Sequence, residues 1–165
     1  MEKLWSPWRS KYIDSFNSGK EKTNCVFCDA VNQKMDDEKS LKVYEGEFCF
    51  AVLNLYPYNS GHVLIIPKRH LSKFDALEEK ELNEVMKISR IIMKALEQII
   101  KPQGFNFGAN IGKAAGAGID DHIHFHILPR WNGDTNFMPA IGEVKIISQD
   151  LLNTKNQLIE AIKKL

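Results

Sequence analysis

Apolar side chains recur at every third or fourth position between residues 76 and 100, and glutamate and lysine fill most of the positions between them. This spacing predicts one long amphipathic helix that buries a single stripe of side chains. Asp75, with Glu78 three residues later, is a helix-start signal, and Pro102 with Gly104 ends the pattern. The predicted buried stripe consists of Leu82, Val85, Met86, Ser89, Ile92, Leu96 and Ile99.

Short apolar runs bounded by turn residues predict strands on both sides of this helix. Pro57, Asn59 and Gly61 mark a tight connection between two of the first strands. A second helical period covers residues 148–165. Strands in hairpin-like order around one long helix predict an α+β fold, with an antiparallel sheet, that helix and a C-terminal helix. The predicted strands cover residues 42–45, 48–53, 62–66, 105–110 and 122–128.

Length and charge narrow the possible functions. The chain has 165 residues with 22 Lys and Arg and 21 Asp and Glu, so its formal net charge is +1. Such a balance gives no broad basic face, which argues against nucleic acid or a membrane surface as the partner. We expect a single domain with an irregular extension (1–24), a core (25–130) and a C-terminal extension (131–165).

Cysteine content and hydropathy indicate a reducing compartment. Three cysteines is an odd number, which disfavours a secreted disulfide scaffold. The first residues lack the apolar segment of a secretion signal, and no apolar stretch approaches the roughly 18 residues of a membrane-spanning helix. These patterns predict a cytoplasmic protein.

The segment 122–128 carries three of the five histidines, at every second position. Because side chains alternate between the faces of a strand, His122, His124 and His126 are predicted to share one face and the apolar residues between them the other. A neutral imidazole, with a reference pKa of about 6.5, has a ring nitrogen free to attack phosphorus. A neighbouring imidazolium holds a phosphate oxygen or protonates a leaving group. The alternatives are a histidine-lined surface strand and a plain metal-binding strand.

Cys25 and Cys28 form a C-x-x-C motif that has three interpretations. A redox pair is disfavoured because no βαβ pattern surrounds the motif. Two buried, inert thiols are the second interpretation. Zinc binding is favoured, since two thiolates at this spacing chelate the ion and histidine supplies the remaining tetrahedral ligands. Cys49 falls in an apolar strand and is predicted to be a core residue.

Two blocks of this sequence resemble the histidine triad family of nucleotide hydrolases and transferases. Residues 122–128 match the family's H-φ-H-φ-H-φ-φ signature, where φ is apolar, and residues 54–70 resemble its upstream block. The blocks occur in the expected order with one long helix between them. The resemblance covers residues 25–129 and implies the same α+β fold. Residues 4–9 and 129–137 are similar to a branch that includes bacterial-type diadenosine tetraphosphate phosphorylases.

The resemblance implies a role for each matching residue. His124 would attack the α-phosphorus and carry a nucleotidyl group, and His126 would contact the scissile phosphate and its bridging oxygen. Asn54 occupies the position that binds ribose hydroxyls, and His62 lines the same pocket. Asn110 matches a residue that contacts phosphate. The implied substrate is an adenine nucleotide, diadenosine tetraphosphate in the branch named above.

The resemblance also implies a metal site and an assembly. Family members with a C-x-x-C motif, and the related galactose-1-phosphate uridylyltransferases, pair the two thiols with two histidines. One stands at the position of His70 and the other is the first histidine of the triad. The implied structural zinc site is Cys25, Cys28, His70 and His122. Family members usually dimerise by joining their sheets edge to edge, so we expect a homodimer.

The loop before the triad departs from the family pattern. Many members carry Gln, Ser or Thr there to hold phosphate, whereas residues 112–118 contain none of these. Asp120 and Asp121 would repel a phosphate that they faced. The backbone amides of this Gly-rich loop, Gly118 among them, can replace the hydroxyl because consecutive N–H groups bind anions. Lys113 adds positive charge. The alternative is a flexible connector.

Aromatic and cationic side chains near these blocks have two interpretations each. The aromatic residues either pack at a subunit contact or form a platform for a second base, and the cations either meet polyphosphate or are solvated. The aromatic residues are Trp5, Trp8, Trp131 and Phe137, and the cations are Lys68, Arg69 and Arg130.

The expected activity is nucleotidyl transfer or hydrolysis at the α-phosphate of a dinucleoside polyphosphate, through a covalent nucleotidyl-histidine intermediate. The sequence leaves open whether inorganic phosphate or water resolves the intermediate. The alternatives are a zinc-stapled purine-nucleotide-binding module without turnover and an adenosine phosphoramidate hydrolase. A protein that acts on adenylated RNA or DNA ends is disfavoured by the neutral charge balance.

Overall fold

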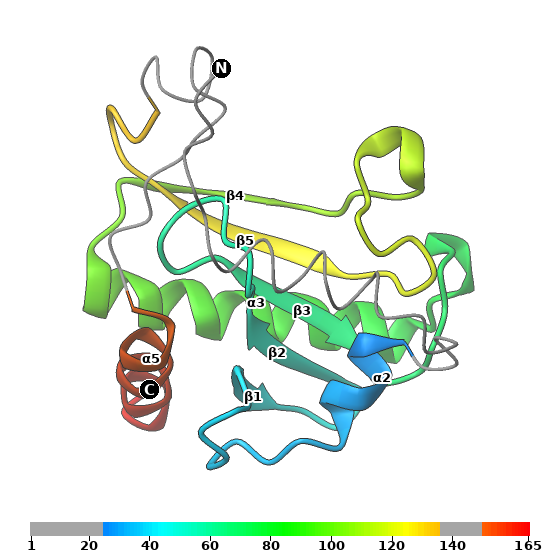
Figure 1. Cartoon of the computed structure of the whole chain (residues 1–165), viewed down its shortest axis with the longest axis horizontal. Coiled ribbons are helices and arrows are strands. Elements are labelled where there is room, and N and C mark those ends of the chain that lie inside the picture. Colours follow the sequence, from blue (N-terminus) through cyan, green and yellow to red (C-terminus); the bar gives the residue numbers. More distant parts are fainter. Residues whose placement is uncertain (1–24, 136–149) are drawn as a thin grey trace, which may run out of the picture.

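Five strands form one antiparallel sheet in the order β1-β2-β3-β5-β4 (Figure 1). The computed structural model describes residues 25–135 and 150–165, so the predictions for Trp5, Trp8 and Phe137 lie outside the described residues. The predicted α+β fold is confirmed. The strands are β1 (Lys42–Glu45), β2 (Cys49–Leu53), β3 (Val63–Pro67), β4 (Gly104–Gly108) and β5 (Phe125–Arg130). The helices are α2 (Val26–Val31), α3 (Glu79–Ile100) and α5 (Leu151–Lys163), with short 3-10 turns η1 (Phe74–Ala76) and η2 (Lys113–Ala115).

The long helix α3 begins three residues later than the sequence pattern predicts. Glu78 precedes its first turn, and the Glu81 carboxylate accepts a hydrogen bond from the Glu78 N–H at 2.8 Å, as in a capping box. Asp75, the predicted start signal, lies instead in η1. At the other end Lys101 has a left-handed backbone conformation, with φ at 46°, which stops the helix.

The larger core lies between α3 and the sheet. Ile88 and Ile92 are almost fully buried there, and α5 packs against α3 and β1 to add Leu158 and Ala161 to the same core. Met86, predicted to be buried, is 59 % exposed, because the buried stripe passes through Ile88 instead. Among the described helices, none has the length and apolar character needed to cross a bilayer.

The strand that carries the triad starts later than predicted. β5 begins at Phe125, so His122 and His124 precede the ladder of hydrogen bonds. Ile123 is nevertheless buried in the α3-side core, together with Phe125 and Ile127. The predicted alternation therefore continues across the start of the strand, with apolar side chains toward α3 and histidines on the other side.

The same strand ends later than predicted. Pro129 lies opposite Phe105 of β4 and beyond Ile127, the last residue paired with β3. The missing N–H of proline therefore costs no hydrogen bond on the β3 side, and the strand continues to Arg130. β4 covers residues 104–108 rather than the predicted 105–110.

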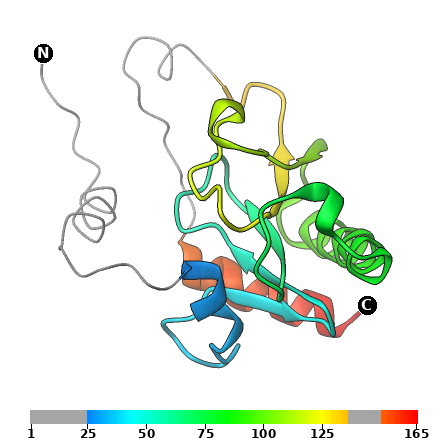
Figure 2. The same cartoon turned by 90° about the vertical axis from the view of Figure 1, so that its right-hand side faces the viewer.

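Helix α2 was not predicted from the sequence. It has only six residues and no apolar period, so it gives no helical signal. α2 lies on the sheet face opposite to α3 (Figure 2). Its Phe27 forms a second, smaller core there, which we call the α2-side cluster: Phe27, Phe50, Val52, Leu64 and Ile66.

Candidate active site and metal site

Three imidazole rings meet on the sheet face opposite to α3. His62 Nε2 lies 2.9 Å from His126 Nδ1, and the ring centroids of His124 and His126 are 5.0 Å apart. His62 directly precedes β3, and Leu64 of that strand pairs with His126, so the strand register brings the rings together. The structure therefore unites the predicted catalytic pair with His62, which comes from a distant part of the sequence.

The hydrogen bonds around His62 determine where the protons lie. The Tyr58 N–H donates to His62 Nδ1 at 3.1 Å, and the Asn54 side-chain amide donates to the same atom at 3.2 Å. His62 must therefore carry its proton on Nε2, from which it donates to His126 Nδ1. His126 in turn carries its proton on Nε2, which is buried and has no partner among the described residues. A buried donor without an acceptor is unfavourable, so this N–H suits an oxygen of a bound ligand.

His124 has the opposite tautomer. Its Nδ1 lies 2.9 Å from the His122 carbonyl oxygen, and a carbonyl can only accept, so the proton of His124 is on Nδ1. Its Nε2 then has a lone pair, to which none of the described residues donates. The site thus places an unprotonated ring nitrogen on His124 next to a donating ring nitrogen on His126, which is the pairing that a nucleophile and a donor require.

Burial keeps these rings neutral at pH 7. It lowers the pKa of His124 and, with a contribution from the His124 ring, lowers the pKa of His126 to about 4. Burial and the two neighbouring imidazoles lower the pKa of His62 to about 3. The neutral nucleophile inferred from the sequence is therefore favoured, whereas the imidazolium neighbour is not present in the free protein.

Two thiols and two imidazoles converge beside the triad. The ligand atoms of Cys25, Cys28, His70 and His122 all lie within 4.8 Å of one another. Cys25 Sγ is 3.3 Å from His122 Nδ1, and Cys28 Sγ is 3.3 Å from His70 Nδ1. Tetrahedral zinc with ordinary bond lengths places a sulfur and a nitrogen ligand about 3.6 Å apart, so the arrangement fits such an ion.

Hydrogen bonding and charge also fit a metal at this site. His122 donates its Nε2–H to the Pro67 carbonyl at 2.9 Å, which leaves Nδ1 free to bind an ion. Partial burial and the neighbouring Cys25 raise the pKa of the Cys28 thiol. A cation acts in the opposite direction because it binds the thiolate. Two thiolates and two imidazoles suit zinc better than calcium or magnesium, which prefer oxygen ligands.

Asn54 lies in the site, but its side chain faces protein groups. Its Oδ1 accepts the Tyr56 N–H at 3.0 Å, while its Nδ2 donates to His62. A further lone pair and a further N–H remain for ribose hydroxyls. Asn110 lies two residues beyond β4, whose Gly108 pairs with His126. Ala109 packs against the α3-side core, so continued alternation would place Asn110 on the triad side. The binding roles of Asn54 and Asn110 stay predictions.

The Gly-rich loop, residues 112–118, uses three of its seven amides internally. The N–H groups of residues 115, 116 and 117 donate to carbonyl groups of the same loop. The Gly118 N–H makes no hydrogen bond to the described residues, and the next residue, Ile119, packs against the α2-side cluster. Lys113 lies 3.7 Å from Asp120, so part of its charge is offset. The Gly118 amide and those of residues 112–114 make no hydrogen bond to the described residues, so a phosphate-binding role for Gly118 stays a prediction.

The cations near the site are paired with carboxylates. Arg130 Nε lies 2.7 Å from Asp134 Oδ2, and its guanidinium lowers the pKa of that carboxyl group. This ion pair also receives the Asn59 side chain, which ties the turn before β3 to the end of β5. The paired cations stay partly exposed, and a polyphosphate role for them stays a prediction. The pairs are Lys68 with Glu45, Arg69 with Glu81, and Arg130 with Asp134.

Two aromatic residues of the site were missed by the sequence analysis. Phe27 has its ring centroid 4.9 Å from that of His124. Tyr58 stacks on His126, with centroids 5.9 Å apart and ring planes at 13°, and is 49 % exposed. The sequence did contain a signal for each residue. Phe27 lies inside the C-x-x-C motif, and Tyr58 lies inside the upstream block, residues 54–70.

A family model described as the HIT domain matches residues 36–133, which is more than half of the chain. The chain belongs to the HIT, or histidine triad, family. This HIT chain is 34 % identical over 163 residues to an AP-4-A phosphorylase of Mycobacterium tuberculosis, covering 96 % of this chain and 83 % of the relative. It is 32 % identical over 109 residues to an adenosine 5′-monophosphoramidase of Schizosaccharomyces pombe, covering 66 % and 76 % of the two chains.

Solved structures agree with the family assignment. A Zn-bound histidine triad family protein from Mycobacterium smegmatis superposes on the HIT chain with a TM-score of 0.69. The two are 28 % identical, and the match covers 86 % of this chain and 94 % of the other. The prediction of an enzyme of the histidine triad type is confirmed by the family match and the named relatives.

Proposed function

We propose that this protein cleaves a nucleoside polyphosphate at its α-phosphate and carries the nucleotidyl group on His124. The opposite tautomers of His124 and His126 carry the proposal, because they supply a nitrogen lone pair and an N–H donor side by side. The relatives named as an AP-4-A phosphorylase and an adenosine 5′-monophosphoramidase support an adenine nucleotide as the substrate.

The first step forms a bond between His124 Nε2 and the α-phosphorus. The bond from phosphorus to the bridging oxygen breaks, and its electron pair stays on that oxygen, which accepts a hydrogen bond from His126 Nε2–H. His62 keeps the proton of His126 on Nε2, because the Tyr58 amide fixes the tautomer of His62. In the second step an oxygen of inorganic phosphate, or of water that loses its proton to solvent, attacks phosphorus and releases His124.

The charge state of His126 favours a dinucleoside polyphosphate, such as diadenosine tetraphosphate, over a phosphoramidate. A polyphosphate leaves as a stable anion and needs only a hydrogen bond, whereas an amine must leave with a full additional proton. A ring whose pKa is about 4 holds no spare proton at pH 7. Adenosine phosphoramidate hydrolysis is the second candidate, and similarity to the phosphoramidase favours it.

Zinc at Cys25, Cys28, His70 and His122 completes this proposal. When bound, the ion supplies structural cross-linking, because four protein ligands leave it no open position for substrate. The thiols must stay reduced to bind it, which supports a cytoplasmic location. Metal analysis of the purified protein would test the assignment, since one zinc per chain is expected and its loss in a Cys28→Ser variant should follow.

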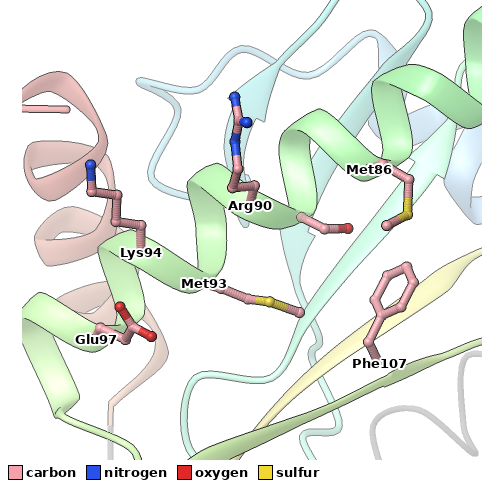
Figure 3. Close-up of a pocket in the computed structure, with 7 residues that line it drawn as sticks. Met86, Arg90, Met93, Lys94, Glu97 and Phe107 are labelled. Atoms are coloured by element: carbon pink, nitrogen blue, oxygen red, sulfur yellow. The ribbon is translucent and has the colours of Figure 1, made fainter.

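A second copy of the chain is the expected partner at the free edge of the sheet. Among the described strands, β4 has a neighbour, β5, on one side only. Beside it Met86 and Met93 of α3 and Phe107 of β4 line a groove (Figure 3). The same groove carries Arg90 and Glu97, so a copy related by a two-fold axis can bring opposite charges together. Light scattering should give a dimer mass for the wild type and a monomer mass for Phe107→Asp.

Product analysis with labelled acceptors tests the function. The protein is incubated with diadenosine tetraphosphate in the presence of ¹⁸O-labelled phosphate, and in parallel in ¹⁸O-labelled water. Phosphorolysis gives ADP and ATP with phosphate-derived label in ADP, and hydrolysis gives AMP and ATP with label in AMP. Binding without product would overturn the proposal in favour of a nucleotide-binding module. Faster turnover of adenosine phosphoramidate would overturn the dinucleotide as the substrate.

A further inference from the structure

Phe27 joins the metal site to the nucleophile. In the sequence it lies between Cys25 and Cys28, and in the structure its side chain is only 6 % exposed. Its ring makes an edge contact with His122, with centroids 5.6 Å apart, and a tilted contact with His124 at 4.9 Å. One aromatic side chain thus contacts both a predicted metal ligand and the nucleophilic ring.

The position of Phe27 depends on groups outside its own helix. α2 has six residues, and Cys25 at its start makes no side-chain capping bond. So short a helix is not stable by itself in water. Lys42 Nζ, which is buried, donates to the Val31 carbonyl at 2.7 Å and holds the far end of α2. At the near end, the two thiols face His122 and His70 and so connect α2 to the predicted metal site.

His124 itself is held by few bonds. Its Nδ1–H donates to the His122 carbonyl, and its Nε2 must stay unbonded to act as a nucleophile. One hydrogen bond does not fix the orientation of the ring by itself, so this buried side chain also depends on packing. The Phe27 ring supplies part of this packing, because close contact on one side of the imidazole excludes orientations that cross it.

We propose that Phe27 is a positioning residue for His124, and that metal binding by Cys25 and Cys28 acts on the nucleophile through it. The bound segment presses Phe27 against the His124 ring and keeps Nε2 directed at the α-phosphorus. The inference rests on the proposed function of His124 as nucleophile. It goes further by giving the metal site a role in the rate of adduct formation, separate from its role in stability.

Phe27→Leu tests the inference, with Phe50→Leu as the matched control. Both residues are buried in the α2-side cluster, and each substitution replaces a ring by a branched aliphatic side chain. Phe50 lies beneath the Lys42 ammonium and, unlike Phe27, makes no ring contact with the triad among the described residues. The two variants therefore lose similar packing but differ in contact with His124. Phe27→Tyr keeps the ring and serves as the conservative rescue.

The expected result is a loss of rate with metal and binding retained. Phe27→Leu should keep one zinc per chain and bind AMP as tightly as the wild type. Its single-turnover rate of nucleotidyl adduct formation should fall by about 10- to 100-fold, the size of effect that a small misplacement of a reacting group produces. Phe27→Tyr should restore most of that rate, and Phe50→Leu should stay within about threefold of wild type.

A second measurement separates failure of this inference from failure of the proposed function. The ¹⁵N signals of the His124 ring should report one tautomer in the wild type and in Phe50→Leu, and averaged or broadened signals in Phe27→Leu. If the wild type forms no adduct, the proposed function fails, and the ring signals still test Phe27. Equal adduct rates in Phe27→Leu and Phe50→Leu, loss of zinc in Phe27→Leu, or an unchanged His124 signal would each overturn the inference.

Discussion

The two faces of the sheet use the same strands for different purposes. On the α3 side, alternate residues of β2, β3 and β5 join α3 and α5 in a large apolar core that contains Ile65, Ile92 and Phe125. On the α2 side, the other alternate residues form a much smaller apolar cluster, beside which buried imidazoles such as His62 and His124 lie.

The difference shows where stability and chemistry reside in this molecule. Apolar burial on the α3 side is favourable without any specific partner. Burial of imidazoles on the α2 side is costly unless their ring nitrogens are hydrogen-bonded, and the His126 Nε2–H has no partner among the described residues. The buried polar groups on the α2 face therefore lower the stability of the fold, and apolar burial on the α3 face offsets this loss. Substitutions on the two faces should have separable effects on activity and stability.

The largest separation is expected for His124→Ala. The substitution removes the proposed nucleophile but leaves the α3-side core intact. Turnover should fall by several orders of magnitude, up to about 10⁶-fold as in enzymes that lose a covalent nucleophile. The melting temperature should stay within a few degrees of wild type. Steady-state kinetics and thermal unfolding measure the two effects, and near-normal turnover would be incompatible with the mechanism.

The reverse effect is expected for Ile92→Ala on the other face. Ile92 is fully buried against the sheet, so its truncation leaves a cavity. The free energy of unfolding should fall by about 2–5 kcal/mol, as for other buried aliphatic residues. The kcat per folded molecule should change little, because Ile92 belongs to the core on the sheet face opposite to the triad histidines. Urea unfolding and active-site titration measure the two quantities; a proportionate loss of kcat would mean that the faces are coupled.

Acid should destabilise the protein through the α2 face. His62 and His126 have pKa values of about 3 and 4 in the folded protein, below the ordinary value of about 6.5 in the unfolded chain. The unfolded chain therefore binds protons first. The stability from the neutral rings is present above pH 6.5 and is lost as the pH falls toward 4, on the order of a few kcal/mol.

A variant without the buried imidazole tests this pH dependence. His62→Gln should be less stable than the wild type at pH 7 and should lose less further stability between pH 6.5 and 4. Urea unfolding across that range gives both slopes. Because the two proteins share the predicted metal site, any zinc released by acid would contribute equally to each. Identical slopes would show that the neutral state of His62 does not contribute.

The smallest effect is expected for the exposed ring of Tyr58. Tyr58→Ala keeps the backbone N–H that fixes His62 but removes the ring that stacks on His126. Such contacts contribute about 0.5–1.5 kcal/mol, so kcat/KM should fall by about 2- to 10-fold. Phe74→Ala is the control, because Phe74 is similarly exposed at 46 % but contacts Phe125 of the α3-side core. Equal effects of the two substitutions would contradict a role for Tyr58 in the site.

The same two faces explain what could be predicted from the sequence. The alternation of 122–128 and the period of α3 are regular over many residues, so the fold and the shared face of the histidines followed from pattern alone. α2 could not be predicted, because six residues give too little pattern and its position depends on Lys42, which lies outside the helix, eleven residues after Val31. Cys49 is buried as predicted, since an apolar strand imposes burial on it.

Proton positions could not be predicted at all. They depend on single hydrogen bonds from groups such as the Tyr58 amide and the Pro67 carbonyl, which folding brings to the imidazoles. The pairing of Arg130 with Asp134 could not be predicted either, because it requires the turn after β5 to reverse the chain. The C-x-x-C motif and the resemblance supplied the candidate metal ligands, and folding brings the four together.

The most direct test of the central claim is the location of a covalent nucleotide. The protein is mixed with diadenosine tetraphosphate, quenched within the first turnover, digested and examined by mass spectrometry. The account predicts one adenylyl group on the peptide that contains residues 122–128, attached to His124 and absent from His124→Ala. An adduct on another residue, or product formation by His124→Ala at the wild-type rate, would contradict the account.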